Sequence, residues 1–492
     1  MGERVQVSPG ATVSPAELQA RLDRSVLALR RMVAEGFFDT AADTCGLEVE
    51  LDLVDPLGRP RQINDKVLAA LGRSDFQVEL GRFNIELNVE PRPVHGGVLR
   101  ALEDELAAVL DEVSATAAPL GARAISVGTL PTLHADDLTA RYLSSNPRYS
   151  VLDVAMSEHR GHPVVVDISG RERLWLQTDS IAVQSAATSL QVHLRVSPTD
   201  FPRFYNAAQA VAPAQVAAGA NSAYLLGRQL WHETRIALIE QSLDIRSASA
   251  PADEPPRTWA GNRWASSAVD LLADNVRLFA PLLGVVDAED PLAELDAGRV
   301  PSLHELRLHN GTVWRWNRPV YDVQHGHPQL RIENRVLPSG PTAADMAANT
   351  ALFLGLVRAV ADDAQPVSVR MPFGLVPVDL VAAARLGLGA TLHWPGPRRV
   401  ESLPARGLLL DVLLPLAADG LDRWGVAPAD RDEYLGLVAD RVRSGRTGAV
   451  WQVATVSGLE ARGWHREGAL REMVRRYVDN ARTREPVHRW PV

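Results

Sequence analysis

Four segments of the chain alternate between polar and aliphatic residues, a pattern typical of β-strands with one apolar face. They are Gly46–Asp55, Phe76–Pro91, Thr188–Pro198 and Gln329–Pro338. Their polar positions carry mainly carboxylates, with one imidazole and three guanidinium groups: Glu48, Glu50, Asp52, Glu79, Glu86, Glu90, His193, Glu333, Arg195, Arg331 and Arg335. Paired as neighbours, these strands gather more negative charge than one sheet face holds unneutralised. The pattern therefore predicts divalent metal on the sheet, with an anionic ligand bound to the metal.

The spacing of Glu48 and Glu50 suits ligands of adjacent metal ions. In an extended strand these positions point to the same face, with Cβ atoms about 6.6–7 Å apart. Oxygen-rich ligation favours Mg²⁺, with Mn²⁺ as the alternative. For this strand alone, a solvated polar face explains the pattern equally well. Its recurrence in four strands favours metal, because solvated faces prefer Thr, Lys and Ser.

The alternation changes phase at Gly81. Aliphatic and aromatic residues take even positions before it and odd positions after it: Phe76, Val78 and Leu80, then Ile85, Leu87 and Val89. Because a shift of one residue moves every side chain to the other face, a bulge or tight turn is predicted at Gly81. This turn leaves Glu79 and Glu86 on one shared acidic face.

Some of the candidate ligands have simpler interpretations. A lone histidine such as His193 is more often a hydrogen-bonded residue than a ligand, so its significance comes from the surrounding carboxylates. Glu333 and Arg335 share a strand face at positions i and i+2. They form either a simple ion pair or a metal ligand beside a cation that binds carboxylate or phosphate, and both interpretations stay open.

Two further features are interpreted as structural. The His325–His327 segment lies in a Gly- and Pro-rich stretch with no third ligand at the usual spacing, so a loop is favoured over a zinc site. Cys45 precedes a strand and has no basic neighbour in sequence, so we interpret it as a structural residue.

Composition excludes several classes of protein. Of 492 residues, 46% are hydrophobic and 23% charged, with a net charge of −9. These values are ordinary for a globular protein and indicate no basic surface for nucleic acid or anionic membrane. Apolar runs fall short of the ~20 residues of a membrane helix, and the first residues lack the apolar core of a signal peptide. We expect a cytoplasmic protein that binds neither nucleic acid nor membrane, in an oligomeric state left open.

The basic residues are almost entirely arginine, because Lys66 is the one lysine among 51 of them. The chain lacks a GxxxxGK[ST] phosphate-binding loop. A pyridoxal or Schiff-base enzyme would depend on Lys66, which follows a turn and looks like an exposed helix start. Any phosphate bound here must therefore be neutralised by arginine, by backbone N–H groups or by metal.

The predicted fold class is α+β: a largely antiparallel, curved sheet with a metal-lined polar face, helices packed on the other face, and a helical C-terminal region. Helices are expected over 14–36, 97–115, 137–157 with a break near Pro147, 201–218, 224–241, 263–283 and 342–362, the last two amphipathic. The expected units are an N-terminal helix over 1–40, a sheet domain over 41–400 and a helical extension over 401–492. Segments 247–256 and 314–326 are candidate lids.

In order, five segments resemble the glutamate–cysteine ligase family, a carboxylate–amine ligase group with a glutamine-synthetase-like catalytic sheet. They are GLEVE from Gly46, VELGRFNIELNVEP from Val78, SLQVHLRV from Ser189, ANSAYLLGR with HETRIALIE from Ala220, and RIENRVLP from Arg331. GTLP at Gly128–Pro131 and PRY at Pro147–Tyr149 resemble the group's GTHP and PRY elements. The resemblance spans about residues 41–362 and depends on the order and spacing of motifs that are individually unspecific.

The resemblance implies a site for ATP and Mg²⁺. Glu48, Glu50, Glu79, Glu86, His193 and Glu333 match the positions that hold the metal. Arg335 and Arg235, with Arg315 or Arg318, would stabilise the transferred phosphoryl group. Arg148, Tyr149, Asn221 and Arg318 would bind substrate and ATP. Leu130 replaces the histidine of GTHP, and the chain after about 402 matches none of the motifs.

The implied activity is ATP- and Mg²⁺-dependent formation of an amide bond through an acyl phosphate. The resemblance makes the γ-carboxylate of glutamate the expected acyl donor and cysteine the default amine, both small-molecule amino-acid substrates. One alternative is phosphagen-kinase-like transfer to a guanidino group, which forms ADP without inorganic phosphate. Another is a non-catalytic relative that binds nucleotide or metal, which the retained set of repelling carboxylates disfavours.

Overall fold

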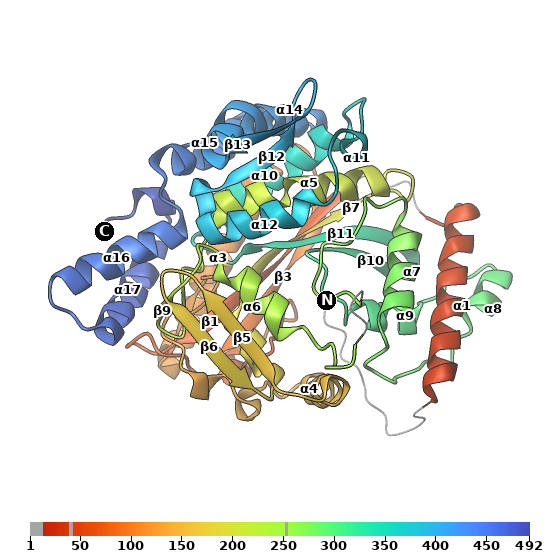
Figure 1. Cartoon of the computed structure of the whole chain (residues 1–492), viewed down its shortest axis with the longest axis horizontal. Coiled ribbons are helices and arrows are strands. Elements are labelled where there is room, and N and C mark those ends of the chain that lie inside the picture. The colour runs from red at the N-terminus through yellow and green to blue at the C-terminus, as the bar shows by residue number, and fades with distance from the viewer. Residues whose placement is uncertain (1–12, 39–42, 251–253) are drawn as a thin grey trace.

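A seven-stranded sheet forms the centre of the computed structural model, which describes residues 13–38, 43–250 and 254–492. Along the sheet the order is β10–β11–β7–β1–β3–β2, and β4 pairs with the end of β1 (Figure 1). The strands are β1 (Thr44–Val54), β2 (Phe76–Val78), β3 (Asn84–Pro93), β4 (Arg123–Ile125), β7 (Ser189–Arg195), β10 (Asn317–Gln324) and β11 (His327–Pro338). Each ladder is antiparallel. The predicted fold class is therefore confirmed.

The four segments that alternate polar and aliphatic residues are consecutive neighbours in the sheet. Their cores are β3, β1, β7 and β11, and the register places Glu50 opposite Glu86 and Glu333 opposite His193. Because side chains alternate along a strand, these positions lie on one face and the intervening aliphatics lie on the other. The aliphatic face is buried, with Leu47, Val49 and Leu51 at most 2% exposed.

The phase change at Gly81 is a tight turn, as the alternation predicted. The Gly81 N–H donates to Asn84 Oδ1 at 3.1 Å, and the Asn84 N–H donates to the Gly81 carbonyl at 2.9 Å. A Cβ atom at position 81 would lie 2.8 Å from Cβ of Ser185, so this close approach requires glycine. The turn carries the chain from β2 to β3 and leaves Glu79 and Glu86 beside the same cavity.

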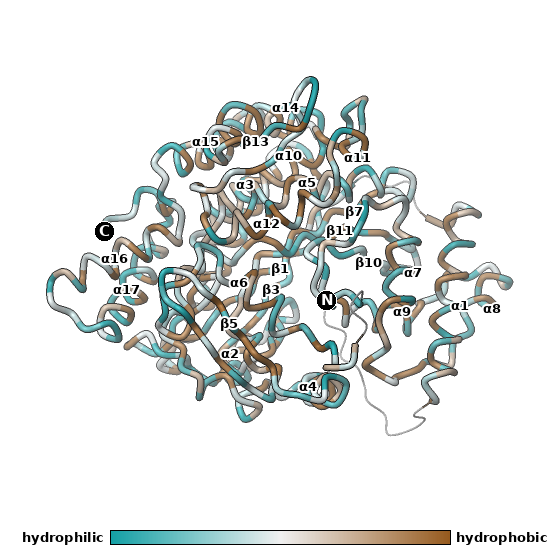
Figure 2. The backbone as a smooth tube through the Cα atoms, viewed as in Figure 1, coloured by the Kyte–Doolittle hydropathy of each residue, from teal (hydrophilic) through white to brown (hydrophobic). Residues whose placement is uncertain are grey.

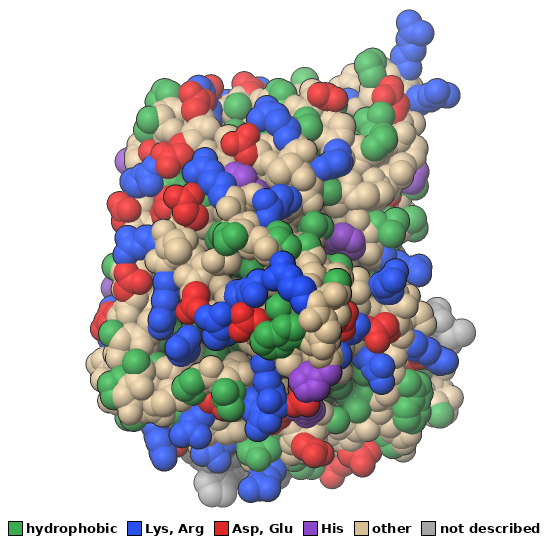
Figure 3. Space-filling view, turned by 90° about the vertical axis from the view of Figure 1, so that its left-hand side faces the viewer, with side chains coloured by type: hydrophobic (Ala, Val, Ile, Leu, Met, Phe, Trp, Pro, Cys, Tyr) green, Lys and Arg blue, Asp and Glu red, His purple; other side chains and the backbone are tan. Residues whose placement is uncertain are grey.

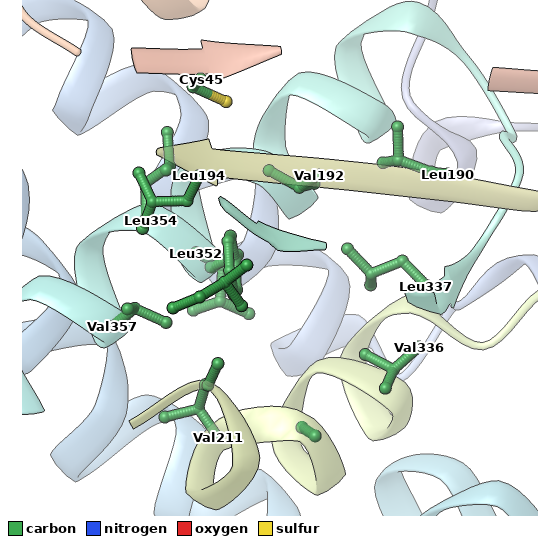
Figure 4. Close-up of a cluster of buried hydrophobic side chains, with 14 of the residues drawn as sticks. Cys45, Leu190, Val192, Leu194, Val211, Val336, Leu337, Leu352, Leu354 and Val357 are labelled. Atoms are coloured by element: carbon green, nitrogen blue, oxygen red, sulfur yellow. The ribbon is translucent and has the colours of Figure 1, made fainter. Parts of the chain in front are cut away.

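Helices cover the apolar face of the sheet. The helices on this side are α3 (Val98–Ala117), α5 (Phe201–Gly219), α10 (Ala343–Ala361) and α12 (Leu375–Leu386). α5 packs on β11, α10 packs on α3 and α5, and α12 packs on α5. Figure 4 shows side chains of β7 and β11, such as Val192 and Leu337, in one cluster with Val211 of α5 and Val357 of α10. This contiguous core fixes the sheet from behind and leaves its polar face open.

The helix expected over 342–362 forms as α10, but the prediction that it is amphipathic was wrong. Nearly every residue of α10 is buried, because sheet-covering helices and the C-terminal helices surround it. Within the described residues, α10 is the one helix long and apolar enough to meet the criteria for a membrane span, and 94% of that window is buried inside the protein. An apolar helix enclosed in this way is a core helix.

The remaining elements surround the sheet and the central helices. The helices are α1 (Pro15–Ala34), α2 (Asn64–Leu71), α4 (Pro147–Arg160), α6 (Thr234–Ser242), α7 (Ala268–Leu278), α8 (Pro291–Asp296), α9 (His304–Asn310), α11 (Val367–Arg370), α13 (Ala405–Gly407), α14 (Leu414–Trp424), α15 (Pro428–Ser444), α16 (Gly448–Ala461) and α17 (Arg466–Ala481). Three hairpins add β5 (Val164–Ser169) with β6 (Arg173–Thr178), β8 (Tyr224–Leu225) with β9 (Arg228–Gln229), and β12 (Thr391–Pro395) with β13 (Val400–Pro404). Figure 2 shows hydrophobic and hydrophilic turns alternating along the peripheral helix α1.

Three expected elements differ in the structure. The helix expected over 137–157 begins only at Pro147, after two short 3-10 turns at 135–137 and 140–142. The helix expected over 224–241 begins only at Thr234, because the β8–β9 hairpin precedes it, turning at Leu226 and Gly227 with φ of 47° and 73°. The candidate lid over 314–326 is largely β10, which pairs with β11 along its whole length. The other candidate lid, 247–256, lies partly outside the described residues.

The helices after residue 402 are packed into the same body as the sheet. α14 and α15 contact α10, and α17 contacts β4. α16 and α17 form the face at the left of Figure 1, where Figure 3 shows acidic and basic side chains interspersed. Near the end of the chain, Trp490 is 1% exposed and packs edge-on against Trp451 and Tyr477.

Candidate active site

A cavity of about 270 Å³ lies over the polar face of the sheet. Its floor comes from β1, β3, β7, β10 and β11, and its walls come from α4, α6, α9 and the 181–186 turn. Carboxylates, arginines and one histidine dominate the floor, whereas Leu152, Ile181, Leu243 and Trp314 give the walls an apolar part. The cavity thus combines a charged floor with a partly apolar enclosure, as small-molecule sites commonly do.

Two groups of potential metal ligands lie on this floor. Glu48, His193 and Glu333 offer one donor atom each within 4.8 Å of one another, and Glu50, Glu79 and Glu86 do the same. In the first group, Nε2 of His193 lies 3.2 Å from Oε1 of Glu48. Five of the six residues lie on four neighbouring strands and Glu79 lies in the turn between β2 and β3, so the sheet and this turn set their spacing. The six residues predicted as ligands are therefore brought together.

The second group is strongly unfavourable without a cation. Burial and the neighbouring carboxylate of Glu79 raise the pKa of Glu50 to about 8. Burial likewise raises the pKa of Glu79, and burial together with Glu48 and Glu79 raises that of Glu86. Oε2 of Glu50 accepts the Ser189 N–H at 2.6 Å, which holds this carboxylate in place. A divalent cation would remove the repulsion.

The first group is neutralised by arginine. Arg318 donates to both oxygens of Glu333, each at 2.9 Å, and Arg335 also donates to Glu333. Although burial alone would raise it, these two guanidinium groups hold the pKa of Glu333 at about 2. Arg335 further donates to Oε1 of Gln191 at 2.5 Å. Glu333 therefore stays ionised, beside two cations that face the cavity.

The donor set fits hard divalent metal. Five carboxylates and one imidazole, arranged as two triads on a rigid sheet, are ligands suited to Mg²⁺ or Mn²⁺ rather than to a thiolate-bound metal. Cys45 is fully buried on the opposite face of β1, and burial raises its pKa to about 12. Its interpretation as a structural residue agrees with this environment.

The cavity is basic at the end away from Glu50, Glu79 and Glu86. Arg307 and Arg331 both pair with Asp322, each at 3.0 Å. Arg331 also lies directly opposite Arg195 across the β7–β11 ladder, and Nε of Arg331 is buried without a hydrogen-bond partner. Like charges opposed on a sheet are destabilising, so this end suits an anionic ligand.

The other predicted residues lie in different places. Arg148 and Tyr149 stand at the start of α4 and line the cavity, and the Tyr149 hydroxyl donates to the Val78 carbonyl at 3.2 Å. Asn221 is fully buried outside the cavity lining, where its side-chain amide donates to the Ser339 carbonyl and the Tyr477 hydroxyl, each at 2.8 Å. Arg235 lines the cavity, but its guanidinium binds protein groups, as described below.

Two residues considered in the sequence lie away from the cavity lining. Leu130 is fully buried in a hydrophobic cluster, so the replacement of histidine there changes the core. Arg315 donates to Asn275 Oδ1 at 2.9 Å and lies 4.9 Å from the Trp259 ring, in a separate pocket.

Sequence reasoning missed several cavity residues. Gln191 precedes His193 by two positions on β7, so the alternation already placed it on the polar face. Arg307 comes from α9, and its distance in sequence from the metal-ligand strands gives no comparable signal. Trp314 and Asp322 lie in the segment 314–326 and were considered only as part of a candidate lid.

Comparison with known proteins places the chain among ligases. The family model described as glutamate–cysteine ligase family 2 matches residues 44–478. This match extends well beyond the motifs noted in the sequence and includes most of the C-terminal helices. No curated protein matches the chain in sequence.

Three solved structures are similar to the chain to different degrees. A glutamate–cysteine ligase from Francisella tularensis in complex with AMP has a TM-score of 0.57 and 11% identity, over 91% of this chain and 90% of that one. A bifunctional glutathione synthetase from Pasteurella multocida has a TM-score of 0.45 and 11% identity, over 93% and 55%. The complex of the ubiquitin-like protein Pup with its ligase PafA has a TM-score of 0.38 and 10% identity, over 86% and 69%. The first of these shows a common fold at very low identity.

Proposed function

Since the chain belongs to glutamate–cysteine ligase family 2 and is a ligase of the glutamate–cysteine ligase type, we propose that it uses ATP and Mg²⁺ to join an amino-acid carboxylate to an amine. The expected acyl donor is the γ-carboxylate of glutamate, and the default amine is cysteine. The observation that carries the proposal is the pair of ligand triads on the sheet, with arginines beside them. Mn²⁺ is the alternative metal, and the expected setting is the cytoplasm.

The charges on the floor suggest how the substrates are arranged. The basic end, with Arg307, Arg318 and Arg331, suits the phosphates of ATP. The acidic end, with Glu50, Glu79 and Glu86, suits a divalent metal ion. That ion would in turn attract the carboxylate of the amino-acid substrate. Glu48, His193 and Glu333 lie between the two ends. This arrangement brings the terminal phosphate of ATP and the acceptor carboxylate together over the two triads.

The proposed reaction has two steps. A carboxylate oxygen of the acyl donor attacks the γ-phosphorus of ATP, which forms an acyl phosphate and releases ADP. The amine nitrogen then attacks the acyl carbon, and inorganic phosphate leaves while the nitrogen loses a proton. Bound Mg²⁺ supplies charge neutralisation during phosphoryl transfer.

The chain's own residues have distinct proposed roles in this reaction. Arg335 and Arg318, now paired with Glu333, are placed to bind the phosphoryl oxygens. Arg148 and Tyr149 line the wall above the acidic end, where they suit the polar groups of the amino-acid substrates. The apolar wall residues Leu152 and Ile181 exclude water from the acyl phosphate, which would otherwise hydrolyse.

Phosphate release from ATP tests the proposal. The assay contains Mg²⁺, glutamate and a panel of amines that includes cysteine, and each component is omitted in turn. Phosphate formation that requires glutamate and one amine supports the ligase and identifies the amine. ADP without inorganic phosphate would instead indicate phosphagen-kinase-like transfer, and no nucleotide turnover in folded protein would indicate a non-catalytic binding protein.

A further inference from the structure

The strand β11 contains a bulge beside the cavity. Its ladder with β7 pairs Asn334 with Val192 and then Leu337 with Leu190, so Arg335 and Val336 together face Gln191. An extra residue of this kind bends the strand and redirects side chains. Alternation from Glu333 places Arg335 on the cavity side, and the bulge then leaves Val336 and Leu337 both buried in the core. The backbone position from which Arg335 reaches into the cavity therefore depends on the bulge.

The guanidinium of Arg235 closes the back of this bulge. Its Nη1 donates to the Arg335 carbonyl at 3.2 Å, and its Nη2 donates to the Val336 carbonyl. The side chain is 3% exposed and lies 5.6 Å from the centre of the Trp316 ring. Bulged residues interrupt the regular ladder, so their buried carbonyls need another donor. Arg235 supplies that donor to both.

Arg235 is itself held by a buried carboxylate. Its Nε donates to Oε1 of Glu233 at 3.0 Å, and Glu233 is 0% exposed. The other oxygen of Glu233 accepts the Asn221 N–H at 2.8 Å. Each nitrogen of the guanidinium therefore donates to a protein oxygen, which differs from a role in contacting the transferred phosphoryl group.

The same network reaches the C-terminal helices. The Asn221 side-chain amide donates to the Tyr477 hydroxyl, and this hydroxyl donates to the Ser126 carbonyl at 2.7 Å. From α16, Nε2 of Gln452 donates to Oδ1 of Asn221 at 3.0 Å. A continuous buried chain of hydrogen bonds thus runs from α17 to the bulge.

We propose that Arg235 is a positioning residue, and that Tyr477 of α17 acts through Asn221 and Glu233 to hold it in place. The network keeps the bulge in the register that aims Arg335 at Glu333 and Gln191. The inference rests on the proposed ligase function, because the guanidinium being aimed is the one assigned to the phosphoryl group. It gives the C-terminal helices a role in the reaction although they lie away from the cavity.

Arg235→Lys tests the first part. Lysine keeps the charge beside Glu233 but cannot span the two carbonyls. We expect kcat per active site to fall by about 10–100-fold while KM for ATP stays within about 3-fold, because a misaimed Arg335 loses contacts made in the transition state. A crystal structure of the variant should show the Arg335 guanidinium displaced by about 1 Å or more. Arg441→Lys is the matched control, because Arg441 is 2% exposed and paired with the buried Asp345, outside the cavity lining.

Tyr477→Phe tests the second part. It removes one hydroxyl and should lower kcat by about 2–10-fold, an effect on the order of one buried hydrogen bond. Tyr434→Phe is the control, because Tyr434 is equally buried in α15 and bonds to Glu103 instead. In a double-mutant cycle, Tyr477→Phe should add little to Arg235→Lys, since both act on the same bulge.

The outcomes separate this inference from the proposed function. Wild-type protein without ligase turnover would refute the function itself. Active wild-type protein whose Arg235→Lys variant keeps the wild-type kcat, or keeps Arg335 in place, would overturn the positioning role. Full additivity in the cycle, or an equal loss of kcat in Tyr434→Phe, would overturn the link to α17.

Discussion

Replacing Glu50 by glutamine should change how the stability of the metal-free protein depends on pH. Burial and Glu79 raise the pKa of Glu50 from an ordinary 4.5 to about 8. A raised pKa means that the folded state binds the proton more tightly than the unfolded state. The stability that Glu50 contributes is therefore fully present below pH 4.5 and is lost as the pH rises through 8.

The size of the effect follows from this shift. At 1.36 kcal/mol per pH unit, titration of Glu50 lowers the free energy of unfolding by about 3 kcal/mol between pH 5 and pH 8. Unfolding a chain of 492 residues changes the entropy by about 1 kcal/mol/K. The wild-type Tm should therefore fall by about 3 °C more than that of Glu50→Gln over this range.

Thermal unfolding in the presence of EDTA measures the difference. Glu90→Gln is the matched control, because Glu90 lies on the neighbouring strand β3 and is exposed. Saturating Mg²⁺ should remove most of the wild-type loss at pH 8 and stabilise Glu50→Gln much less. Parallel Tm curves for wild type and Glu50→Gln between pH 5 and pH 8 would refute the reasoning that burial raises the pKa of Glu50 in the metal-free protein.

Three further predictions follow from the site. Glu48→Gln removes a ligand from the first triad and should lower phosphate release by about 10²–10³-fold at saturating Mg²⁺; turnover within 3-fold of wild type would contradict its assignment. Arg331→Gln removes a cation from the basic end and should raise KM for ATP by about 10–100-fold, with a smaller change in kcat, as expected for a charged hydrogen bond worth about 1.5–3 kcal/mol; an unchanged KM would place the nucleotide elsewhere. The Cys45 thiol is fully buried and its pKa is about 12, so a thiol-specific reagent should label it in denaturant and leave the native protein unlabelled at pH 8; rapid native labelling would argue against its buried position.

Much of the site was predictable from sequence because most of its ligands lie on strands. Alternation with a period of two is a local property, so it assigned Glu48, Glu50 and Glu333 to a polar face before their partners were known. The phase change at Gly81 likewise fixed the face of Glu79 relative to Glu86. A single sequence could therefore indicate a metal-lined sheet.

The helices and loops around the sheet were predicted less well. The segment 224–233 has enough apolar residues for a helix, yet it forms a short hairpin because Gly227 and Leu226 turn with positive φ. The segment 314–326 was considered a candidate lid, and only its pairing with β11 shows that most of it is the strand β10. In both cases pairing with the next strand of a hairpin overrode the preference of the segment by itself.

The sequence by itself determined which strand faces are acidic, because side-chain alternation needs no knowledge of the partner strand. Only the tertiary structure decided that Arg307 joins the cavity, that Asn221 lies behind it, and that Arg235 holds a bulge instead of facing substrate. The physical reason is that these positions depend on how β11 pairs with β7 and how α6, α9 and α17 pack around them. Those contacts join residues that are up to hundreds of positions apart, and no periodic pattern in the chain records them.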